Sequence, residues 1–387
     1  MPITCSTYED ACDALKNGDL EQALYDAGAK VMADALITLH GEEHRRRRIV
    51  EYGVFSKKFF RLYETDIFPR TLKPLLAHHG QQDYCDLVEL GYQLTMNLTA
   101  DFAGIDRLEK SLEETQTLLH LVKTFSAGAT MVHSTLVAEQ INEQVDEALD
   151  LFDTQFLKPS VTRRQALIRD GQELPNDVLS KILSSDVSLT PDVLRREMAF
   201  YLQAGAHSTA NSIVHAFHEI DRWQNAEGNR TELLADDLFL QRCVHESLRL
   251  HPASPVAWRR ALENTEVAGH KLQKGEKVII DLAAANQDVN VFGSDAQNFN
   301  PIRALPNGVW PFGLTFGLGV HACMGRALDG GVLPASNAPH QLGIVTLVVK
   351  TLLSLGASVS KDNLPQKDES TSRNNWGYYP VKLGTVT

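Results

Sequence analysis

The stretch F-G-L-T-F-G-L-G-V-H-A-C-M-G, residues 312–325, sets the expectations for the rest of this chain. It places one cysteine, Cys323, at the end of a glycine-rich loop, behind an aromatic pair and a histidine, His321. Glycine reaches left-handed and tightly packed backbone conformations that are closed to other residues, so this loop can lie close against a flat body. A cysteine at its end is placed to act as a ligand.

Written as F-x-x-G-x-H-x-C-x-G, the segment from Phe316 to Gly325 resembles the haem-binding loop of the cytochrome P450 family. The resemblance implies that Cys323 is the thiolate ligand of haem iron, that Phe316 and Gly325 belong to the cofactor site, and that His321 reaches a haem propionate. The implied cofactor is haem b (iron protoporphyrin IX). A thiolate ligand pushes electron density toward bound dioxygen and favours O–O cleavage.

Three other interpretations of this loop remain open. Cys323 could be a buried free cysteine in a glycine-rich loop, or part of a zinc site, although zinc requires further Cys/His pairs at short spacing and the sequence shows none. Cys323 could also be a nucleophile with His321 as its base. Two residues apart in one turn is poor geometry for that pair.

The composition is that of an ordinary globular protein. With 387 residues, 43% of them hydrophobic, the chain can bury a large core, and we expect residues 1–387 to form a single domain. A net charge of -12 argues against a nucleic-acid-binding protein, which needs a basic patch. The five cysteines are scattered without a C-x-x-C pair, which favours reduced thiols and a cytoplasmic location.

Neither a signal peptide nor a membrane anchor is expected. The N-terminus lacks a positive segment followed by an apolar one. The longest apolar run, residues 342–357, is interrupted by Lys350 and is shorter than the ~20 residues that a membrane span requires.

A basic segment, L-H-G-E-E-H-R-R-R-R-I-V at residues 39–50, has the spacing of a helix with His44 and Arg48 on one face. Taken alone it is a solvated basic helix. Its H-x-x-x-R spacing also resembles the family helix that donates to a haem propionate, which implies that role for His44 and Arg48. The arginines at 45–47 would then point outward, near the face where an acidic redox partner docks.

Residues 51–158 have the pattern of a series of helices. Residues 107–158 predict two of them, separated near residues 126–128. The second has one apolar stripe, which is more typical of a core face than of the substrate lid that the family builds here: Ile141, Val145, Ala148, Leu149 and Phe152.

A long helix starts at Thr190–Pro191 and is apolar on most sides, as expected for a helix that crosses the protein centre. Its segment A-G-A-H-S-T resembles the family's oxygen-binding motif, in which an acid and an alcohol relay protons. His207 stands at the acid position and Ser208 at the alcohol position, so the resemblance makes Gly205, His207 and Ser208 the residues facing oxygen. A core histidine beside a helix-bending serine is the alternative.

A helix at residues 236–250 contains the pair Glu246 and Arg249, one turn apart. The F-x-P-x-R pattern that follows adds Arg303. The resemblance implies that these three residues form a buried structural triad and take no part in the chemistry.

Short β-type runs follow Pro255. In the family, the first of these strands carries an arginine to the second propionate. Arg259 fits the family spacing R-x-A-x-E best, with Arg260 as the second candidate.

Two regions depart from the family pattern. The start of the chain is expected to be shortened, without the usual first helix and the outer strands of the small sheet. After Cys323 the family runs one unbroken helix, whereas residues 329–340 contain two adjacent glycines and two prolines, which must break it. The helix is expected to resume near residues 341–355.

Together these observations predict a mainly α protein with a small β region, and the resemblance implies a cytochrome P450 fold. The implied activity is insertion of one oxygen atom of dioxygen into a hydrophobic small molecule, by hydroxylation or oxidative dealkylation. No G-x-G-x-x-G segment before a suitable helix offers a flavin or nicotinamide site, so the implied electron donors are a separate ferredoxin and its reductase. A peroxide-driven enzyme and a non-catalytic haem or gas-binding protein are the alternatives.

Overall fold

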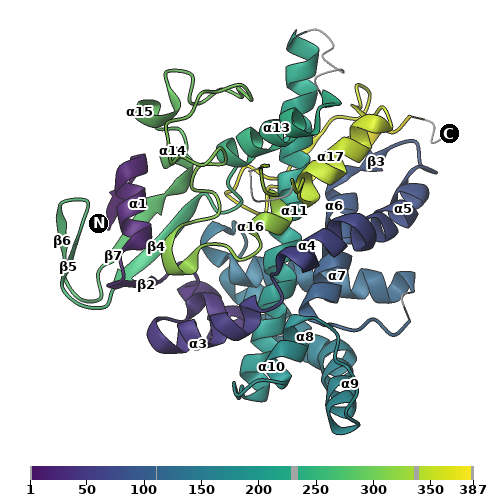
Figure 1. The fold of residues 1–387 in the computed structure, drawn as a ribbon, viewed down its shortest axis with the longest axis vertical. Helices are drawn as coiled ribbons and strands as arrows, with labels where there is room; N and C mark the ends of the chain where they lie inside the picture. Colours follow the sequence, from purple (N-terminus) through teal and green to yellow (C-terminus); the bar gives the residue numbers. More distant parts are fainter. Residues whose placement is uncertain (1, 110, 228–233, 335–339, 385–387) are drawn as a thin grey trace.

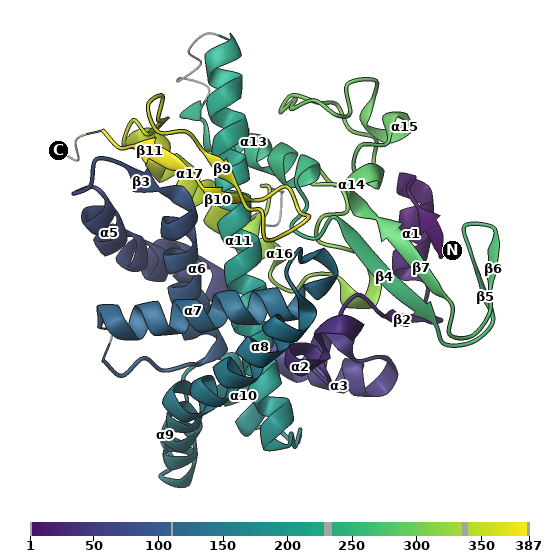
Figure 2. The ribbon, with the colours of Figure 1, turned by 180° about the vertical axis from the view of Figure 1, so that it is seen from behind.

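One helix, α11 (Pro191–Glu227), runs through the centre of the molecule, and the other elements are arranged around it (Figures 1 and 2). The computed structural model describes residues 2–109, 111–227, 234–334 and 340–384. As the sequence predicts, α11 begins at Pro191, and the Thr190 hydroxyl accepts a hydrogen bond from the Val193 amide. It packs along α6, α7, α13 and α17, so most of its faces are covered.

The chain is mainly helical with small sheets. The other α-helices are α1 (Tyr8–Lys16), α2 (Ala29–Met32), α3 (Gly41–Tyr52), α4 (Lys57–Leu62), α5 (Phe68–His79), α6 (Leu87–Ala103), α7 (Leu112–Ala129), α8 (Ala138–Phe152), α9 (Lys158–Arg169), α10 (Val178–Leu183), α13 (Asp237–Leu250), α14 (Leu282–Ala285), α15 (Val289–Phe292), α16 (Arg326–Asp329) and α17 (Ile344–Ser354). The strands are β1 (Ile3–Cys5), β2 (Leu20–Gln22), β3 (Cys85–Asp86), β4 (Val256–Ala261), β5 (Thr265–Val267), β6 (His270–Leu272), β7 (Lys277–Asp281), β8 (Ser358–Val359), β9 (Gln366–Lys367), β10 (Trp376–Tyr378) and β11 (Pro380–Lys382).

The largest sheet has the strand order β1-β7-β4-β2 and lies at one side of the molecule (Figure 1). Strand β1 pairs with β7 in parallel, while β4 is antiparallel to both β7 and β2. The expectation that the N-terminal region lacks outer strands of the sheet is therefore wrong for β1 and β2. Three-residue strands carry too little alternation for the sequence pattern to separate them from the helical segments beside them.

Several helices follow the sequence pattern closely. Thr7 caps α1 by accepting from the Asp10 amide, and Asp236 caps α13 through its carboxylate. The apolar stripe of α8 is buried, from Ile141 at 2% exposed to Phe152 at 0%. Its side chains pack into the main core, so the interpretation as a core face is confirmed.

The arginine run of α3 does not point outward throughout. Arg45 and Arg46 are exposed, but Arg47 is 1% exposed. Its guanidinium donates to the Asp34 carbonyl at 2.6 Å and pairs with Glu197 of α11. The prediction that all three arginines fan out is wrong for Arg47, because a 12-residue helix on the surface must turn one side inward.

The helix after Cys323 is interrupted as predicted. It consists of the short α16 and the later α17, and the chain between them leaves and returns at nearly the same place. An antiparallel bridge joins Val332 to Gln341. The Gln241 side chain amide donates to the Gly330 carbonyl at 3.1 Å and to the Gln341 carbonyl at 2.7 Å. We call residues 330–343 the excursion.

The excursion closes so tightly that only glycine fits where its ends meet. Gly331 has φ 75° and Gly343 has φ 80°, both in the left-handed region. A Cβ atom on Gly343 would lie 2.4 Å from the Gly331 amide nitrogen and 2.5 Å from the Asp329 carbonyl oxygen.

Within the described residues, we find no helix that combines the length and apolar character needed to cross a bilayer.

Candidate active site

A cavity of about 350 Å³ lies between α11, the loop that carries Cys323 and strand β4. Cys323 contributes to its wall. The Cys323 side chain is accessible although its sulfur lies deep within the protein, because the accessible part faces this cavity. The sulfur is therefore available to a bound group and sheltered from bulk solvent.

The backbone of the Cys323 loop is held from both ends. The Cys323 amide donates to the Phe316 carbonyl at 2.8 Å, which closes the turn before the cysteine. Upstream, Gly313 has φ 58°, and a Cβ there would lie 2.2 Å from Oδ1 of Asn286. Oδ1 of the same asparagine accepts from the Leu314 amide at 2.7 Å. Gly313 thus allows the loop to approach Asn286 closely, while the expectation that the glycines let the loop lie against a flat body stays a prediction.

The environment of the sulfur acts in two directions. Burial, and then the Asp329 carboxylate, raises the pKa of the Cys323 thiol to about 11. The Gly325 amide donates to the sulfur, and Arg48 and Arg326 lie near it, and all three favour the thiolate. A metal ion bound to the sulfur would deprotonate it outright.

Imidazole and guanidinium groups gather beside Cys323. The rings of His44 and His321 are 4.5 Å apart, centroid to centroid. Arg48 and Arg259 also line the cavity, and Arg48 donates to the Ala322 carbonyl at 2.5 Å. The structure therefore brings together four side chains that the sequence analysis assigned to haem propionates from three separate segments.

These groups lack the anionic partners that such a cluster favours. Nε2 of His44 and both ring nitrogens of His321 are buried and have no hydrogen-bond partner among the described residues. Burial, and then the neighbouring Arg259, lowers the pKa of His321 to about 3. Burial, and then Arg48, lowers the pKa of His44 to about 4. An anionic group between them would supply the missing hydrogen bonds and offset the repulsion.

Arg259 and Arg260 are separated by the pleat of β4. Arg259 is 4% exposed, lines the cavity and donates to Oε1 of Gln22 at 2.6 Å. Arg260 points to the other side of the strand and pairs with Glu21 at 2.7 Å and Asp26 at 3.0 Å. Successive side chains on a strand face opposite ways, so only one of the two can face the cavity.

The residues present fit haem. A soft sulfur ligand lines the same cavity as the guanidinium groups of Arg48 and Arg259 and the two unpartnered ring nitrogens of His321, with the His44 ring directly behind, which suits a metal-bearing ring with carboxylate arms. No group of three or more His, Cys, Asp or Glu side chains suited to hold a metal ion by themselves occurs within the described ranges.

On the opposite wall, α11 contributes Gly205 and Ser208 to the cavity. A Cβ on Gly205 would lie 2.8 Å from Oγ1 of Thr99, so this glycine allows α6 to approach α11 closely. The Ser208 hydroxyl donates to the Ala204 carbonyl at 2.6 Å, and its lone pairs remain able to accept a hydrogen bond.

His207 lies on another face of α11. It is absent from the cavity lining, and its Nδ1 is 2.5 Å from the hydroxyl of Tyr92 on α6. Burial lowers the pKa of His207 well below the usual histidine value, so the ring is neutral. The role of His207 as a proton relay stays a prediction, and this orientation does not favour it.

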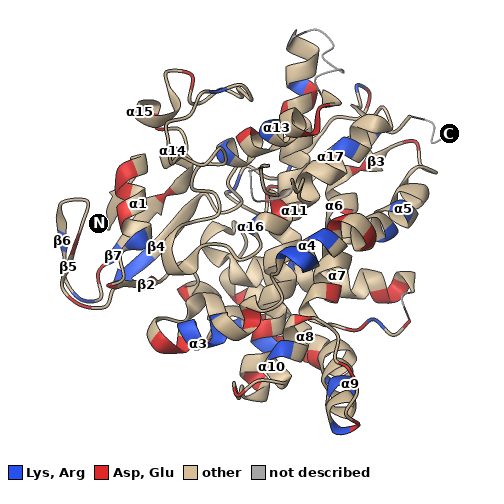
Figure 3. Cartoon of the chain, in the orientation of Figure 1, with Lys and Arg blue, Asp and Glu red and all other residues tan. Residues whose placement is uncertain are grey.

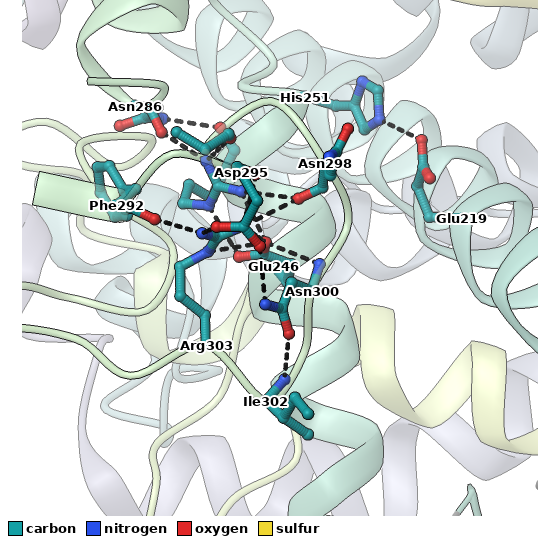
Figure 4. A network of polar contacts seen from close by, with 12 residues as sticks. Glu219, Glu246, His251, Asn286, Phe292, Asp295, Asn298, Asn300, Ile302 and Arg303 are labelled. Atoms are coloured by element: carbon teal, nitrogen blue, oxygen red, sulfur yellow. Dashed lines mark hydrogen bonds and ion pairs between the residues drawn. The ribbon is translucent and has the colours of Figure 1, made fainter. Parts of the chain in front are cut away.

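Glu246, Arg249 and Arg303 form the expected triad, in which Arg249 and Arg303 both pair with Glu246 (Figure 4 labels Glu246 and Arg303). The Arg249–Glu246 ion pair measures 2.6 Å and the Arg303–Glu246 pair 3.1 Å, and all three side chains are nearly fully buried. Arg249 also donates to the Asn286 carbonyl at 2.6 Å. The Asn286 side chain in turn accepts from the Leu314 amide of the Cys323 loop. The triad therefore helps to hold that loop through Arg249 and Asn286.

Two cavity residues were missed by the sequence analysis as parts of the site. Asp329 lines the cavity, its Oδ1 has no hydrogen-bond partner in the described part of the chain, and burial raises its pKa to about 6. Tyr201 of α11 also lines the cavity and donates to Oε2 of Glu51 at 2.6 Å. The spacing of Tyr201, four residues before Gly205 on one helical face, could have indicated its position.

Comparison with known proteins gives one consistent family. The model of the family described as Cytochrome P450 matches residues 89–328, which is more than half of the chain. Cytochrome P450 109 of Bacillus spizizenii is 24% identical over 391 residues, covering 95% of this chain and 85% of that protein. A Steroid C26-monooxygenase of Mycolicibacterium smegmatis is 25% identical over 344 residues, covering 84% of this chain and 75% of that protein.

Solved structures agree in fold. The structure described as P450BioI in complex with an acyl carrier protein ligated to hexadec-9Z-enoic acid superposes with a TM-score of 0.77 at 19% identity, covering 98% of this chain and 92% of that one. CYP109E1 from Bacillus megaterium, solved with testosterone, superposes with a TM-score of 0.74 at 19% identity, covering 99% and 93%.

Proposed function

We infer that this chain, which belongs to the cytochrome P450 family, is a haem-thiolate monooxygenase that inserts one oxygen atom of dioxygen into a hydrophobic small molecule. One observation carries the inference: the sulfur of Cys323 and the unpartnered ring of His321 line a single cavity that α11 closes on the other side, and the ring of His44 lies against His321. The cofactor we propose is haem b.

The chain's own side chains would hold that cofactor. Cys323 would bind the iron, with Phe316 and Gly325 shaping the loop around the sulfur. His44, Arg48, Arg259 and His321 would donate to the propionates. When bound, a haem with a thiolate ligand supplies the activation of dioxygen and the transfer of one oxygen atom. The remaining steps, which are substrate positioning, water exclusion and proton supply, fall to the protein.

The substrate we propose is apolar, because the cavity wall away from Cys323 is built from hydrophobic side chains. They come from the N-terminal region, α6 and α11: Leu36, Ile37, Phe55, Leu98, Phe102 and Phe200. Few of these groups can hydrogen-bond, so desolvation of an apolar molecule provides the binding energy, at about 25 cal/mol per Å² of apolar surface buried. Hydroxylation and oxidative dealkylation both begin at a C–H bond of such a molecule.

A separate ferredoxin and its reductase are the electron donors we propose. Exposed basic side chains lie on α4 and α3, where Figure 3 shows blue segments: Lys57, Lys58, Arg61, Arg45 and Arg46. On α3 they stand beside the acidic Glu42 and Glu43, so α4 carries most of the positive charge. A positive face of this kind would attract an acidic partner to the side of the molecule where Arg48 contacts the Cys323 loop. A cytoplasmic location, expected from the free cysteines, also stays a prediction.

Peroxide-driven oxidation is a second candidate. It is favoured by His207, which replaces the expected acid and bonds to Tyr92 instead of facing the cavity. A non-catalytic haem or gas-binding protein is the third, motivated by the interrupted helix after Cys323.

The decisive experiment uses the purified protein supplied with haem. Reduced protein with carbon monoxide should show the absorption band that names the family. Substrate-dependent oxygen uptake with a ferredoxin system would then identify a monooxygenase, whereas turnover with hydrogen peroxide alone would favour the second candidate. A protein that stays colourless after haem is supplied would contradict the proposal.

A further inference from the structure

A second, larger cavity of about 880 Å³ opens further along α11, toward the C-terminal end of that helix. Its wall is formed by the second half of α11, the end of α13 and the segment before β10, and it is rich in amide and charged side chains such as Asn211, Arg222 and Asn298. Ser212 and Ala253 line both this cavity and the one that contains Cys323. The two cavities are therefore neighbours, and Ser212 and Ala253 form part of the wall of both.

A strip of polar side chains on α11 connects the two cavities. Ser208, Ser212, His215 and Glu219 follow one another at spacings of four, three and four residues, which places them along one face of the helix. Ser208 and Ser212 line the Cys323 cavity, while Ser212, His215 and Glu219 line the open one.

The strip is built from groups that can pass a proton. Ser212 and His215 are 4% and 5% exposed. His251, at the end of α13, stacks on His215 with ring centroids 4.3 Å apart, and its Nε2 lies 2.8 Å from Oε1 of Glu219 (Figure 4). Burial lowers the pKa of His215 well below the usual value, so this ring is neutral and can accept a proton at one nitrogen while donating from the other.

Neighbours three and four residues apart on a helix have Cβ atoms about 5–6 Å apart, a gap that one water molecule bridges between polar side chains. The open cavity, at about 880 Å³, has room for such water. The strip thus links bulk solvent to Ser208 without involving His207, whose ring is bonded to Tyr92.

We propose that Ser212, His215 and Glu219, together with His251, form the proton supply route of this enzyme from the open cavity to Ser208. The inference rests on the proposed monooxygenase activity. That reaction consumes one dioxygen, two electrons from the redox partner and two protons; one oxygen atom enters the C–H bond and the other leaves as water. The route delivers the two protons, and each group on it takes up one proton for every one that it gives up.

The sharpest test compares Ser212→Val with Ser212→Thr, because valine and threonine have nearly the same shape and differ in the hydroxyl group. In the valine variant, the yield of product per electron falls about tenfold and superoxide, whose formation from dioxygen takes one electron and no proton, is released in its place, since a positioned proton donor contributes at least that much. The threonine variant retains the wild-type yield. Glu219→Gln tests the solvent end and lowers the yield as well.

A measurement without turnover gives an independent readout. Ferric iron accelerates the magnetic relaxation of bulk-water protons to the extent that protons near the iron exchange with solvent. Exchange is slower in Ser212→Val and Glu219→Gln than in Ser212→Thr. Asn225→Ala is the matched control, because Asn225 lines the open cavity but lies beyond the strip on α11; it leaves both readouts unchanged.

The outcomes separate this inference from the proposed function. Product formation driven by hydrogen peroxide, which brings its own protons, stays at the wild-type level in all variants. Equal yields and equal exchange in the valine and threonine variants, in protein that binds haem and oxidises substrate, overturn the proton route alone. A wild-type protein that binds no haem overturns the proposed function instead.

Discussion

The two walls of the Cys323 cavity differ in how closely they follow the family motif. On the loop wall, Phe316, His321, Cys323 and Gly325 all lie at or beside the cavity, as the motif implies. On the α11 wall, two of the three motif residues line the cavity and His207 does not. In a loop that turns at fixed glycines, the backbone leaves each side chain little choice of direction. On a helix, consecutive side chains point about 100° apart, so His207 can face away from the cavity although the next residue, Ser208, faces it.

The comparison teaches that several independent contacts hold the cofactor side of the cavity in place, whereas the oxygen side depends on single side chains. The loop is held by its own backbone, by Asn286 and, through Arg249, by the triad. The α11 wall relies on single side chains that can be exchanged without disturbing the helix. The predictions below test this difference, beginning with the largest expected effect.

Replacing Cys323 by serine should abolish the thiolate-type absorption band of the reduced, carbon-monoxide-treated protein, because an alcohol does not replace a thiolate as the iron ligand. The absorption spectrum after haem loading measures this effect. Cys12→Ser is the control, since Cys12 lies on α1 outside the cavity lining and should leave the spectrum unchanged. A retained band in Cys323→Ser would remove the basis of the site.

Replacing Glu246 by glutamine should lower the free energy of unfolding by roughly 3–5 kcal/mol, because Arg249 and Arg303 would keep buried charges without a carboxylate partner. Denaturant unfolding measures the loss. The control Glu42→Gln breaks the exposed pair with Arg45 and should leave the free energy of unfolding almost unchanged, because solvent screens this pair. Similar losses for both variants would show that the triad is not a structural anchor.

Replacing Arg259 by alanine should weaken haem binding by roughly 1.5–3 kcal/mol, the value of a hydrogen bond to a charged group. Haem titration of the apoprotein measures the affinity. Arg260→Ala, on the opposite side of β4, should leave haem affinity unchanged. If the Arg260 variant were the weaker binder, the assignment of the two arginines would have to be exchanged.

Replacing Tyr92 by phenylalanine should lower the free energy of unfolding by about 1 kcal/mol, because His207 loses a buried hydrogen-bond partner. The yield of product per electron should stay the same, since neither ring nitrogen of His207 lies on the cavity wall. A clear drop in that yield would instead support His207 as the proton relay.

Most of the fold and the cofactor side of the site could be predicted from the sequence, because they depend on short-range patterns. Gly313 and Cys323 mark the loop by spacing alone, and the caps at Thr7 and Asp236 mark helix starts. Strands β1 and β2 could not be predicted in the same way, since their pairing partners lie more than 200 residues away. The direction of His207 depends on Tyr92, which no local pattern links to it.

The open cavity also escaped the sequence analysis. His215, Glu219 and His251 come from two helices, and only the packing of α11 against α13 brings them together. The spacing of the strip on α11 is present in the sequence, but the sequence analysis did not single it out. Its meaning depends on which of its residues face each cavity, and that requires the structure.

The closed ends of the excursion have a practical consequence. Gly331 and Gly343 bring the two ends of the excursion into contact. We therefore expect that residues inserted between Val332 and Gln341 have little influence on α16 and α17. Sites of this kind tolerate the insertion of whole foreign domains. A fluorescent reporter or a fused electron-transfer module could be grafted there, a few residues along the chain from the sulfur, without rebuilding the body of the enzyme.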